Sequence, residues 1–247
     1  MESSRTPIAV IGAGYVGLVT AAGFASLGVE VFCVDIDQTK IEQLQRGEVP
    51  IYEPGLAELI ASNHDRLHFA TTLDAAIEHA QLLFVCVGTP PTYSGDADLE
   101  AVNAVVEAMP SSGQHALVMK STVPCGTGES LRRVFAEQGK AGLAYVACPE
   151  FLKEGSAIDD FMHPDRVVIG DDGDAAGDVV ATLYQPLGAP VLRTDIASAR
   201  NELFLRNCAQ LGDAVANRAH VAHSFDDVAA AGFALAANHR RAFGDPP

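Results

Sequence analysis

The sequence is 247 residues long, carries a formal net charge of −16, and is 48% hydrophobic and 19% charged. This length suits one large domain, or one domain with part of another, and the composition favours a buried core over a disordered chain. The negative charge argues against nucleic acid or anionic membranes as partners because the protein repels polyanions, although local donors could still hold a small anionic ligand.

Short β-branched runs alternate with amphipathic or Ala-rich stretches over the first three quarters of the chain. The alternation predicts βαβ units, and runs that are apolar throughout predict strands buried on both faces. We therefore expect an α/β, Rossmann-like, doubly wound and mostly parallel sheet with helices on both faces. The predicted strands are Ile8–Ile11, Val29–Val34, Leu67–Ala70, Leu82–Val87, Ala116–Lys120, Ala144–Ala147, Arg166–Ile169 and Val191–Arg193. The predicted helices include Val16–Leu27, Leu99–Ala108, Glu129–Gln138 and Asp174–Tyr184.

The character of the sequence changes after Asp195. The stretch Ile196–Ala242 is rich in Ala, Asn, His and Arg, lacks regularly spaced apolar residues and contains no strand pattern. We therefore expect residues 1–195 to form the α/β domain and residues 196–247 to be a divergent helical or disordered tail.

Signals for export or membrane insertion are not expected. Met1–Pro7 has no basic region leading into an apolar stretch, and the apolar run Ile8–Ile11 is far shorter than the roughly 20 residues of a membrane helix. The five cysteines form no CxxC pair, which predicts reduced thiols, a cytoplasmic location and no metal site. Cys33 and Cys86 lie in apolar runs and are predicted to pack in the core.

A glycine-rich motif, Gly-Ala-Gly-Tyr-Val-Gly, follows the first predicted strand and opens a helix. Gly12 would permit the tight turn, Gly14 would let the backbone approach a pyrophosphate, and Gly17 would let helix and strand pack closely. Free N–H groups and the positive helix end would then face the phosphates. Glycines also punctuate ordinary turns, so this motif needs a second signal.

Asp35 supplies that second signal at the end of the second predicted strand, 18 residues beyond Gly17. An acidic residue at about this spacing binds the hydroxyls of the adenosine ribose. Asp35 would also repel a 2′-phosphate, so NAD is favoured over NADP. Lys40 is expected to be a solvated charge near either the ribose or the phosphates.

Three further loops follow predicted strands or precede helices. The segment Ile51–Leu56 is predicted to be a turn before a helix, because its Pro and Gly interrupt regular secondary structure. Thr89, in the Val-Gly-Thr-Pro-Pro segment, lies at the carboxyl end of the fourth strand, where ligands of open α/β sheets bind. Lys120–Thr127 follows the fifth strand and should place the hydroxyls of Ser121 and Thr122 at the rim of the site. Each loop could equally be a polar connection after a buried strand.

Two carboxylates four residues apart, Glu150 and Glu154, follow the sixth strand with Lys153 between them. We expect these residues to open a helix, which would place both acids on one face. Acidic residues are also simply favourable in the first turn of a helix.

Taken together, these motifs resemble the nucleotide-sugar 6-dehydrogenase family, in particular its UDP-glucose branch. The resemblance covers roughly residues 7–199 and rests on GAGYVGL, VDID, PIYEPGL, VGTPP, STVPCGT and PEFLKEGSAIDDFMHPDRVVIG, in this order and spacing. It implies oxidation of the sugar C6 alcohol to a carboxylate in two NAD-dependent steps, through a thioester on a catalytic cysteine, as part of nucleotide-sugar metabolism and polysaccharide biosynthesis.

The resemblance also implies roles for particular residues. Thr122 would help to hold a catalytic water, with Glu150 or Glu154 as its acid/base partner. The residues expected to contact NAD are Gly12, Gly14, Tyr15, Val16, Gly17, Asp35, Lys40, Thr89, Thr122 and Glu154. Those expected to border the sugar nucleotide are Glu150, Phe151, Leu152, Lys153 and Glu154.

Departures from the family pattern concentrate beyond Ala199. Arg200 stands at the family's acidic position and Leu203 at its Lys position, while Asn207 falls at the Asn position in a divergent context. The Gly-x-Cys-Phe-Pro-Lys-Asp stretch that carries the catalytic cysteine does not occur in the 247 residues, nor do the family's middle and C-terminal domains. Cys148 stands where the family has Asn, outside that motif, and is not a candidate nucleophile.

The sequence therefore predicts an NAD-dependent, UDP-glucose 6-dehydrogenase-like oxidoreductase whose chain is truncated, or altered in reading frame near residue 200, and is inactive alone. Two alternatives stay open: a GDP-mannose or other UDP-sugar 6-dehydrogenase, and a catalytically silent NAD-binding module. The resemblance implies UDP-glucose or a related nucleotide sugar as partner, and a homodimer formed through the central helix that diverges here.

Overall fold

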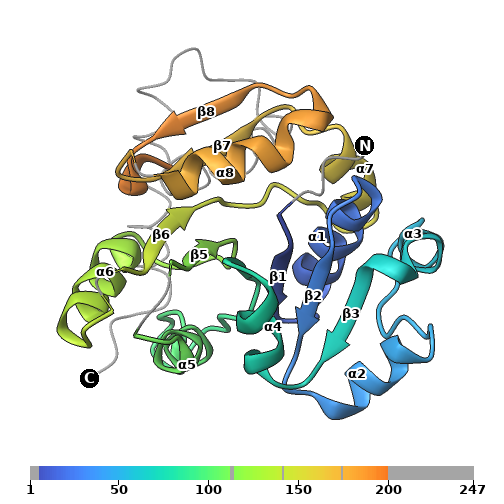
Figure 1. Cartoon of the computed structure of the whole chain (residues 1–247), viewed down its shortest axis with the longest axis horizontal. Coiled ribbons are helices and arrows are strands. Elements are labelled where there is room, and N and C mark those ends of the chain that lie inside the picture. Colours follow the sequence, from blue (N-terminus) through green and yellow to red (C-terminus); the bar gives the residue numbers. More distant parts are fainter. Residues whose placement is uncertain (1–5, 112–113, 141, 174, 200–247) are drawn as a thin grey trace, which may run out of the picture. The chain divides into compact units, whose positions relative to one another are not determined.

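Eight short strands form one sheet in the order β3-β2-β1-β4-β5-β6-β7-β8 in a computed structural model, which describes residues 6–111, 114–140, 142–173 and 175–199 (Figure 1). Neighbouring strands run parallel except β6 and β7, which meet antiparallel at Ala147 and Gly170. The strands are β1 (Ile8–Ile11), β2 (Val31–Val34), β3 (Leu67–Ala70), β4 (Leu82–Val85), β5 (Ala116–Met119), β6 (Ala144–Ala147), β7 (Val167–Gly170) and β8 (Val191–Thr194). The predicted α/β fold is confirmed, and all eight predicted strands are present.

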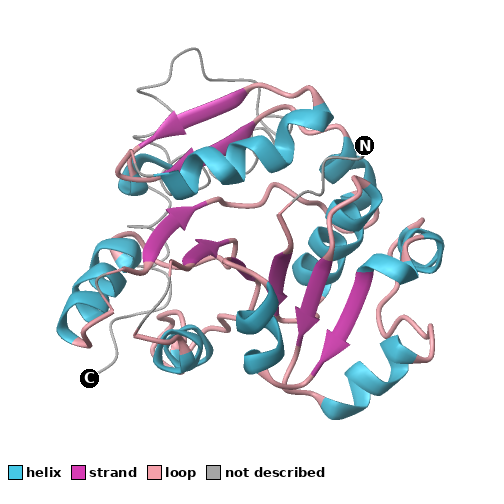
Figure 2. Cartoon of the chain, viewed as in Figure 1, coloured by secondary structure: helices cyan, strands magenta, loops and turns pink. Residues whose placement is uncertain are grey.

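Helices connect successive strands and cover the sheet (Figure 2). The four predicted helices form, and their ends lie within two residues of the predicted ones. Short 3₁₀ turns occupy His64–Arg66 and Gln185–Leu187. The α-helices are α1 (Tyr15–Ser26), α2 (Gln38–Gln45), α3 (Leu56–Ser62), α4 (Leu73–His79), α5 (Glu100–Ala108), α6 (Thr127–Glu137), α7 (Ala157–Met162) and α8 (Ala175–Tyr184).

Two cores lie on opposite faces of the sheet, as strands that are apolar on both faces require. Along β1, Ile8 and Val10 belong to the core beneath α1, α7 and α8, while Ala9 and Ile11 belong to the core beneath α4, α5 and α6. In the first core, Phe24 of α1 lies 5.1 Å from the ring of Phe84, between ring centroids. This double burial fixes the position of β1, and with it the loop that follows the strand.

Glu150 and Glu154 do not open a helix, so the prediction that they share a helix face is wrong. Both lie in the loop before α7, which begins only at Ala157. Gly155 has a φ of 88°, in the left-handed region, which interrupts any helix there. The backbone N–H groups that would start the helix instead donate to side-chain carboxylates of Glu53 and Asp160.

The predicted tail lies almost entirely outside the described residues. Of its first residues, Ile196 is 5% exposed and Ala199 is fully buried. Both pack in the core that includes Leu117 and Val168. The proposed domain boundary at residue 195 therefore stays a prediction. No helix in the described part of the chain is long and apolar enough to cross a membrane.

Lys140, in the loop after α6, donates hydrogen bonds to carbonyl groups at the C-terminal end of α5. Its substitution gives a first test of the fold. Its side chain is 6% exposed, and Nζ donates to the carbonyl oxygens of Val106 (2.7 Å) and Glu107 (2.9 Å). We expect Lys140→Met to lower the free energy of unfolding by about 1–3 kcal/mol, because both carbonyls lose a donor. Urea denaturation at an unchanged m-value would measure the loss.

The exposed Lys153 provides the control for this prediction. Its side chain is 60% exposed in an ion pair with Asp160, so Lys153→Met should cost less than about 1 kcal/mol. Equal losses in the two variants would contradict a specific role of Lys140 at the helix end.

Candidate functional site

The predicted motifs meet at one edge of the sheet, formed by the carboxyl ends of the parallel strands. The glycine motif follows β1, Asp35 follows β2, Thr89 follows β4 by a few residues, and the loops that begin at Lys120 and Cys148 follow β5 and β6. The chain order of the strands reverses at β1, which pairs with β2 on one side and with β4 on the other. Ligands of open α/β sheets bind at such a reversal.

The glycine turn has the geometry that its sequence predicts. Gly12 has a φ of 101°, and a Cβ atom there would lie 2.7 Å from the carbonyl oxygen of Cys86. A Cβ atom on Gly17 would collide with the carbonyl oxygen of Gly12, so this glycine lets α1 pack against the end of β1. By contrast, a Cβ atom on Gly14 would meet nothing within 4 Å.

The beginning of α1 is therefore open toward solvent. Gly14 is the N-cap residue, and it has no side chain that could accept a hydrogen bond from the first N–H groups of the helix. Tyr15 and Val16 are half-buried. The first N–H groups of a helix have no partner within the helix. Open space at Gly14 together with these donors fits the pyrophosphate of a dinucleotide.

Asp35 is held in place by three donors. Its Oδ2 accepts from the backbone N–H of Ala13 (2.7 Å) and from Nζ of Lys40 (3.0 Å), and its Oδ1 accepts from the N–H of Asp37 (3.0 Å). Burial alone would raise the pKa of Asp35, but these hydrogen bonds outweigh it and hold the pKa below its usual value. The carboxylate is thus ionised and fixed in orientation, with acceptor capacity left for a hydroxyl.

Lys40 is an ion-pair partner of Asp35 rather than an isolated solvated charge. Its side chain is 26% exposed and that of Asp35 is 11% exposed. The pair therefore places a cation beside the carboxylate that is expected to meet the ribose.

The loops after β4 and β5 are joined directly. Thr89 Oγ1 donates to the carbonyl oxygen of Thr122 at 2.6 Å, which brings two predicted site residues together. Thr122 is exposed, whereas Ser121 is 8% exposed and its hydroxyl donates inward to the carbonyl oxygen of Val87 at 2.7 Å. The prediction of two hydroxyls at the rim is therefore wrong for Ser121, because this hydroxyl satisfies the backbone of the neighbouring loop.

Glu53 connects the glycine turn to the loop after β6. Its Oε2 accepts from the hydroxyl of Tyr15 (2.6 Å) and the N–H of Gly155 (2.8 Å), and its Oε1 accepts from the N–H of Ala157 (2.8 Å). The Tyr15 hydroxyl also lies 3.1 Å from the carbonyl oxygen of Lys153. The Glu53 carboxylate therefore connects its own turn to the start of α1 and to the loop before α7, two segments far away in the sequence.

The loop after β6 presents its side chains to different environments. Phe151 and Leu152 are half-buried and pack against the two cores, and the guanidinium of Arg166 lies 5.9 Å from the centroid of the Phe151 ring. Glu150 is half-buried, while Lys153 and Glu154 are exposed. The apolar residues thus anchor the loop, and its charged residues remain at the surface of the candidate site.

Three of the described cysteines are buried, namely Cys33, Cys86 and Cys148, and Cys125 is exposed. The predicted core packing of Cys33 and Cys86 is confirmed. Burial raises the pKa of Cys86 to about 12, with Lys120 lowering it and Glu150 raising it. Burial also raises the pKa of Cys33, so the thiols of Cys33 and Cys86 are protonated at neutral pH, while Cys208 lies outside the described residues.

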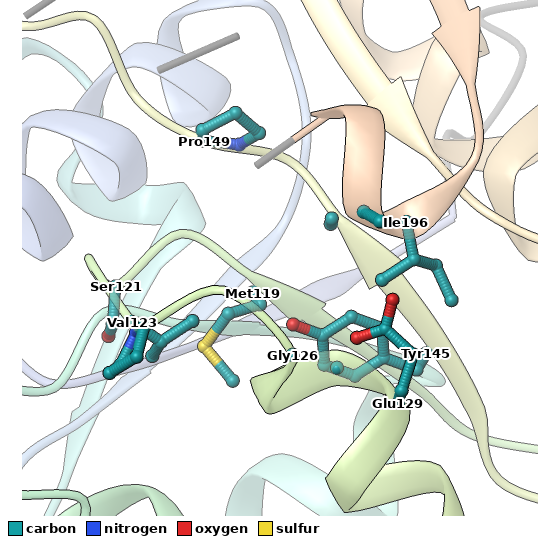
Figure 3. Close-up of a pocket in the computed structure, with 12 residues that line it drawn as sticks. Met119, Ser121, Val123, Gly126, Glu129, Tyr145, Pro149 and Ile196 are labelled. Carbon is teal, nitrogen blue, oxygen red and sulfur yellow. The ribbon is translucent and has the colours of Figure 1, made fainter. Parts of the chain in front are cut away.

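A small cavity lies beside this edge, between β5, β6 and the start of α6. Met119, Ser121, Tyr145 and Ile196 are among the residues that line it, and Glu129 extends into the same region (Figure 3). Its volume of about 20 Å³ suffices for a water molecule but not for a nucleotide. The candidate dinucleotide site is therefore the open edge around Gly14 and Asp35, not this cavity.

Comparison with known proteins agrees with this geometry. Residues 6–188 match the sequence profile described as "UDP-glucose/GDP-mannose dehydrogenase family, NAD binding domain". The chain belongs to this family. The match runs from the residues before β1 to the turn before β8, so it contains every motif at the carboxyl edge. The predicted resemblance and the NAD-binding domain are confirmed, and NAD is the cofactor of this domain.

Curated relatives from the UDP-glucose branch match the same part of the chain. UDP-glucose 6-dehydrogenase TuaD of Bacillus subtilis (strain 168) is 43% identical over 206 residues, which are 81% of this chain and 45% of TuaD. A UDP-glucose 6-dehydrogenase of Rhizobium meliloti (strain 1021) is 45% identical over 188 residues, or 73% of this chain and 43% of that enzyme. The chain thus spans about half the length of the curated relatives it matches.

Solved structures of both branches share the fold. A UDP-glucose dehydrogenase from Pyrobaculum islandicum aligns with a TM-score of 0.78 at 37% identity, covering 84% of this chain and 50% of the other. GDP-mannose dehydrogenase from Pseudomonas aeruginosa aligns with a TM-score of 0.79 at 32% identity, with coverage of 84% and 50%. Backbone similarity therefore does not separate the two branches.

Two residues of the family domain were not singled out from the sequence. Glu53 read as part of a Pro-Gly turn, and only the structure reveals that this charged residue is 5% exposed. Ile36, directly after Asp35, is 96% exposed. An apolar residue beside a carboxylate that is expected to bind a ribose was a usable signal, since the aromatic base of a nucleotide offers an apolar face.

Proposed function

We propose that this chain supplies the NAD-binding part of a UDP-glucose 6-dehydrogenase, which oxidises the C6 alcohol of UDP-glucose to the carboxylate of UDP-glucuronate. The observation that carries the proposal is the joining of the glycine turn to the loop after β6 through Tyr15 and Glu53. A dinucleotide site and a loop rich in charged residues thereby share one edge of the sheet. The sugar follows from the curated relatives, which are UDP-glucose 6-dehydrogenases at 43% and 45% identity.

The residues at this edge fit NAD in distinct ways. Backbone N–H groups at the start of α1 would bind the pyrophosphate, Asp35 would bind the adenosine ribose, and Ile36 would lie against the adenine. Thr89 and Thr122, joined by their hydrogen bond, would border the nicotinamide end together with Glu154. When bound, NAD supplies the hydride acceptor for the oxidation.

The protein's own acid/base groups would come from two loops. Thr122 is exposed and would hold a water near the reacting alcohol, and Glu150 or Glu154 would take the hydroxyl proton. The segment from Glu150 to Glu154 would border the sugar nucleotide, with Phe151 and Leu152 as its anchors.

Two further candidates stay open. GDP-mannose or another UDP-sugar is an alternative substrate, because the fold is shared equally with a UDP-glucose dehydrogenase and a GDP-mannose dehydrogenase. A catalytically silent NAD-binding module is favoured by the burial of Cys33, Cys86 and Cys148, which leaves Cys125 as the exposed thiol among the described residues.

We further propose a cytoplasmic location, a first domain of residues 1–195 followed by the divergent segment 196–247, and a homodimer as the family's assembly.

Isothermal titration of the purified chain tests the proposal. We expect NAD to bind, and UDP-glucose to bind in the presence of NAD more tightly than GDP-mannose does. Binding of GDP-mannose in preference would favour the other branch, and binding of NAD without either sugar nucleotide would favour the silent module. A chain that binds no NAD would contradict the proposal altogether.

The 247-residue chain by itself is predicted not to sustain turnover. The second oxidation requires a thiolate that captures the aldehyde. Cys33 and Cys86 are buried with raised pKa values, and the exposed Cys125 lies outside the Gly-x-Cys-Phe-Pro-Lys-Asp motif of the family. We expect NADH production from UDP-glucose to be at least about a hundred- to thousandfold below that of a full-length relative, the range lost when a stabilising group is removed. NADH absorbance measures the rate, and steady turnover proportional to protein concentration would refute the prediction.

A further inference from the structure

Glu53 is a buried carboxylate for which the proposed chemistry has no direct use. It is 5% exposed and accepts hydrogen bonds from the Tyr15 hydroxyl, the Gly155 N–H and the Ala157 N–H at 2.6, 2.8 and 2.8 Å. Burying a charge is unfavourable unless donors surround it, so the three donors and the carboxylate stabilise one another. Their arrangement is therefore a fixed connection and not a surface contact.

The backbone and the hydroxyl of Tyr15 lie in two different parts of the candidate site. Its backbone begins α1, next to Gly14 and the open turn that fits a pyrophosphate. Its phenol reaches across to Glu53 and to the carbonyl oxygen of Lys153. One side chain therefore connects the dinucleotide turn to the loop that carries Lys153 and Glu154.

The direction of the hydrogen bond is fixed at neutral pH. Burial raises the pKa of Tyr15, and Glu53 raises it further, so the phenol keeps its proton. Burial alone would raise the pKa of Glu53, but the Tyr15 hydroxyl and the N–H groups of Gly155 and Ala157 bring it below its usual value. The phenol donates and the carboxylate accepts throughout the neutral range.

We propose that Glu53 is a positioning residue that ties the loop 153–157 to the first turn of α1, so that NAD binding at the turn tightens the loop. The inference rests on the proposed function, since it takes this loop as the border of the sugar nucleotide. Coupling between two sites is reciprocal, so a sugar nucleotide on the loop would favour NAD to the same degree. Glu53 itself touches neither ligand.

Hydrogen exchange of the Gly155 and Ala157 amides, with and without saturating NAD, tests the two parts of this inference. In the absence of NAD, Glu53→Gln should speed exchange at both amides about tenfold or more, because an amide group replaces an ionised acceptor. In the unsubstituted chain, NAD should slow exchange at both amides about fivefold or more, the lower end of typical coupling between sites. Tyr15→Phe should reduce this NAD effect to less than about twofold.

Two matched controls separate the connection from general loss of structure. Tyr52→Phe removes the hydroxyl of a tyrosine that is 90% exposed and directly precedes Glu53, and Glu58→Gln neutralises an exposed acid on α3. Both controls should exchange like the unsubstituted chain, and restoration of slow exchange in Glu53→Asp would support a role for the charge itself. Amides elsewhere, such as those of β4, report whether a variant is folded.

The possible failures are distinguishable. If NAD does not bind to the unsubstituted chain, the proposed function and the coupling both fail, while fast exchange in Glu53→Gln would still support the connection. If NAD binds but Tyr15→Phe keeps the full NAD effect, the coupling is overturned and the proposed function stands. Exchange at Gly155 and Ala157 that is unchanged in Glu53→Gln would overturn the role of Glu53.

Discussion

Gly17→Ala is expected to destabilise the protein and abolish NAD binding, whereas Gly14→Ala should weaken NAD binding alone. A Cβ atom on Gly17 collides with the backbone carbonyl of Gly12, which cannot move aside as a flexible side chain can. Gly12 is itself fixed because its N–H donates to the Val34 carbonyl at 2.7 Å. We expect a loss of about 3 kcal/mol or more in the free energy of unfolding, at the upper end of the effect of overpacking.

Gly14 provides the contrast within the same turn. Its φ of −82° suits alanine, and a Cβ atom there meets no protein atom within 4 Å. The free energy of unfolding should therefore change by less than about 1 kcal/mol. The same methyl group would occupy the space of the pyrophosphate and weaken NAD binding at least about tenfold, as expected when a hydrogen bond to a charged group is lost.

Urea denaturation and isothermal titration of the two variants separate packing from binding. Full NAD affinity in Gly14→Ala would place the pyrophosphate elsewhere. A Gly17→Ala variant as stable as the unsubstituted chain would contradict the close approach of α1 to β1. The unsubstituted chain, measured at the same salt concentration, is the reference for both.

The sheet could be predicted from the sequence because its signal is local. Each strand is a short apolar run, and burial on both faces, as at Ile8 and Ala9, makes the run continuous rather than alternating. The glycine turn was predictable for a similar reason, since Gly12 and Gly17 each satisfy a separate steric demand within six residues. Asp35 followed from its spacing to the turn.

The parts that were not predictable depend on contacts between distant segments. Glu53 lies 102 residues from Gly155, and no local pattern relates a Pro-Gly turn to the loop before α7. The same contact explains the wrong helix at Glu150, because Glu53 and Asp160 bind the N–H groups that a helix would have used. The Ser121 hydroxyl points inward for an equivalent reason, because it donates to the carbonyl oxygen of Val87, 34 residues away in the sequence.

The chain is expected to bind NAD at least about a hundredfold more tightly than NADP, since opposed like charges cost several kcal/mol. The carboxylate of Asp35 is held by the N–H groups of Ala13 and Asp37, so it cannot turn away from a 2′-phosphate. Its lowered pKa keeps it ionised throughout the neutral range. Isothermal titration at low, matched salt would measure both affinities, because screening weakens such effects.

Substitution of Asp35 should reduce the ratio of NAD affinity to NADP affinity, and the size of the reduction should depend on Lys40. In Asp35→Ala the repulsion is lost, and the Nζ of Lys40, 3.0 Å from Asp35 Oδ2 in the unsubstituted chain, becomes free to attract the 2′-phosphate. We expect the preference to fall below about tenfold, since an exposed charge contact contributes up to about 1 kcal/mol. Asp35→Ala also removes the acceptor for the Ala13 N–H. Asp35→Asn is the control for this loss, because its side chain has the same size and its amide oxygen can accept that hydrogen bond without carrying a charge. Adding Lys40→Met to Asp35→Ala should remove part of the gain in NADP affinity and lower NADP affinity more than NAD affinity. Equal affinities for NAD and NADP in the unsubstituted chain would show that Asp35 does not face the ribose, because no other arrangement of this fixed carboxylate avoids the phosphate.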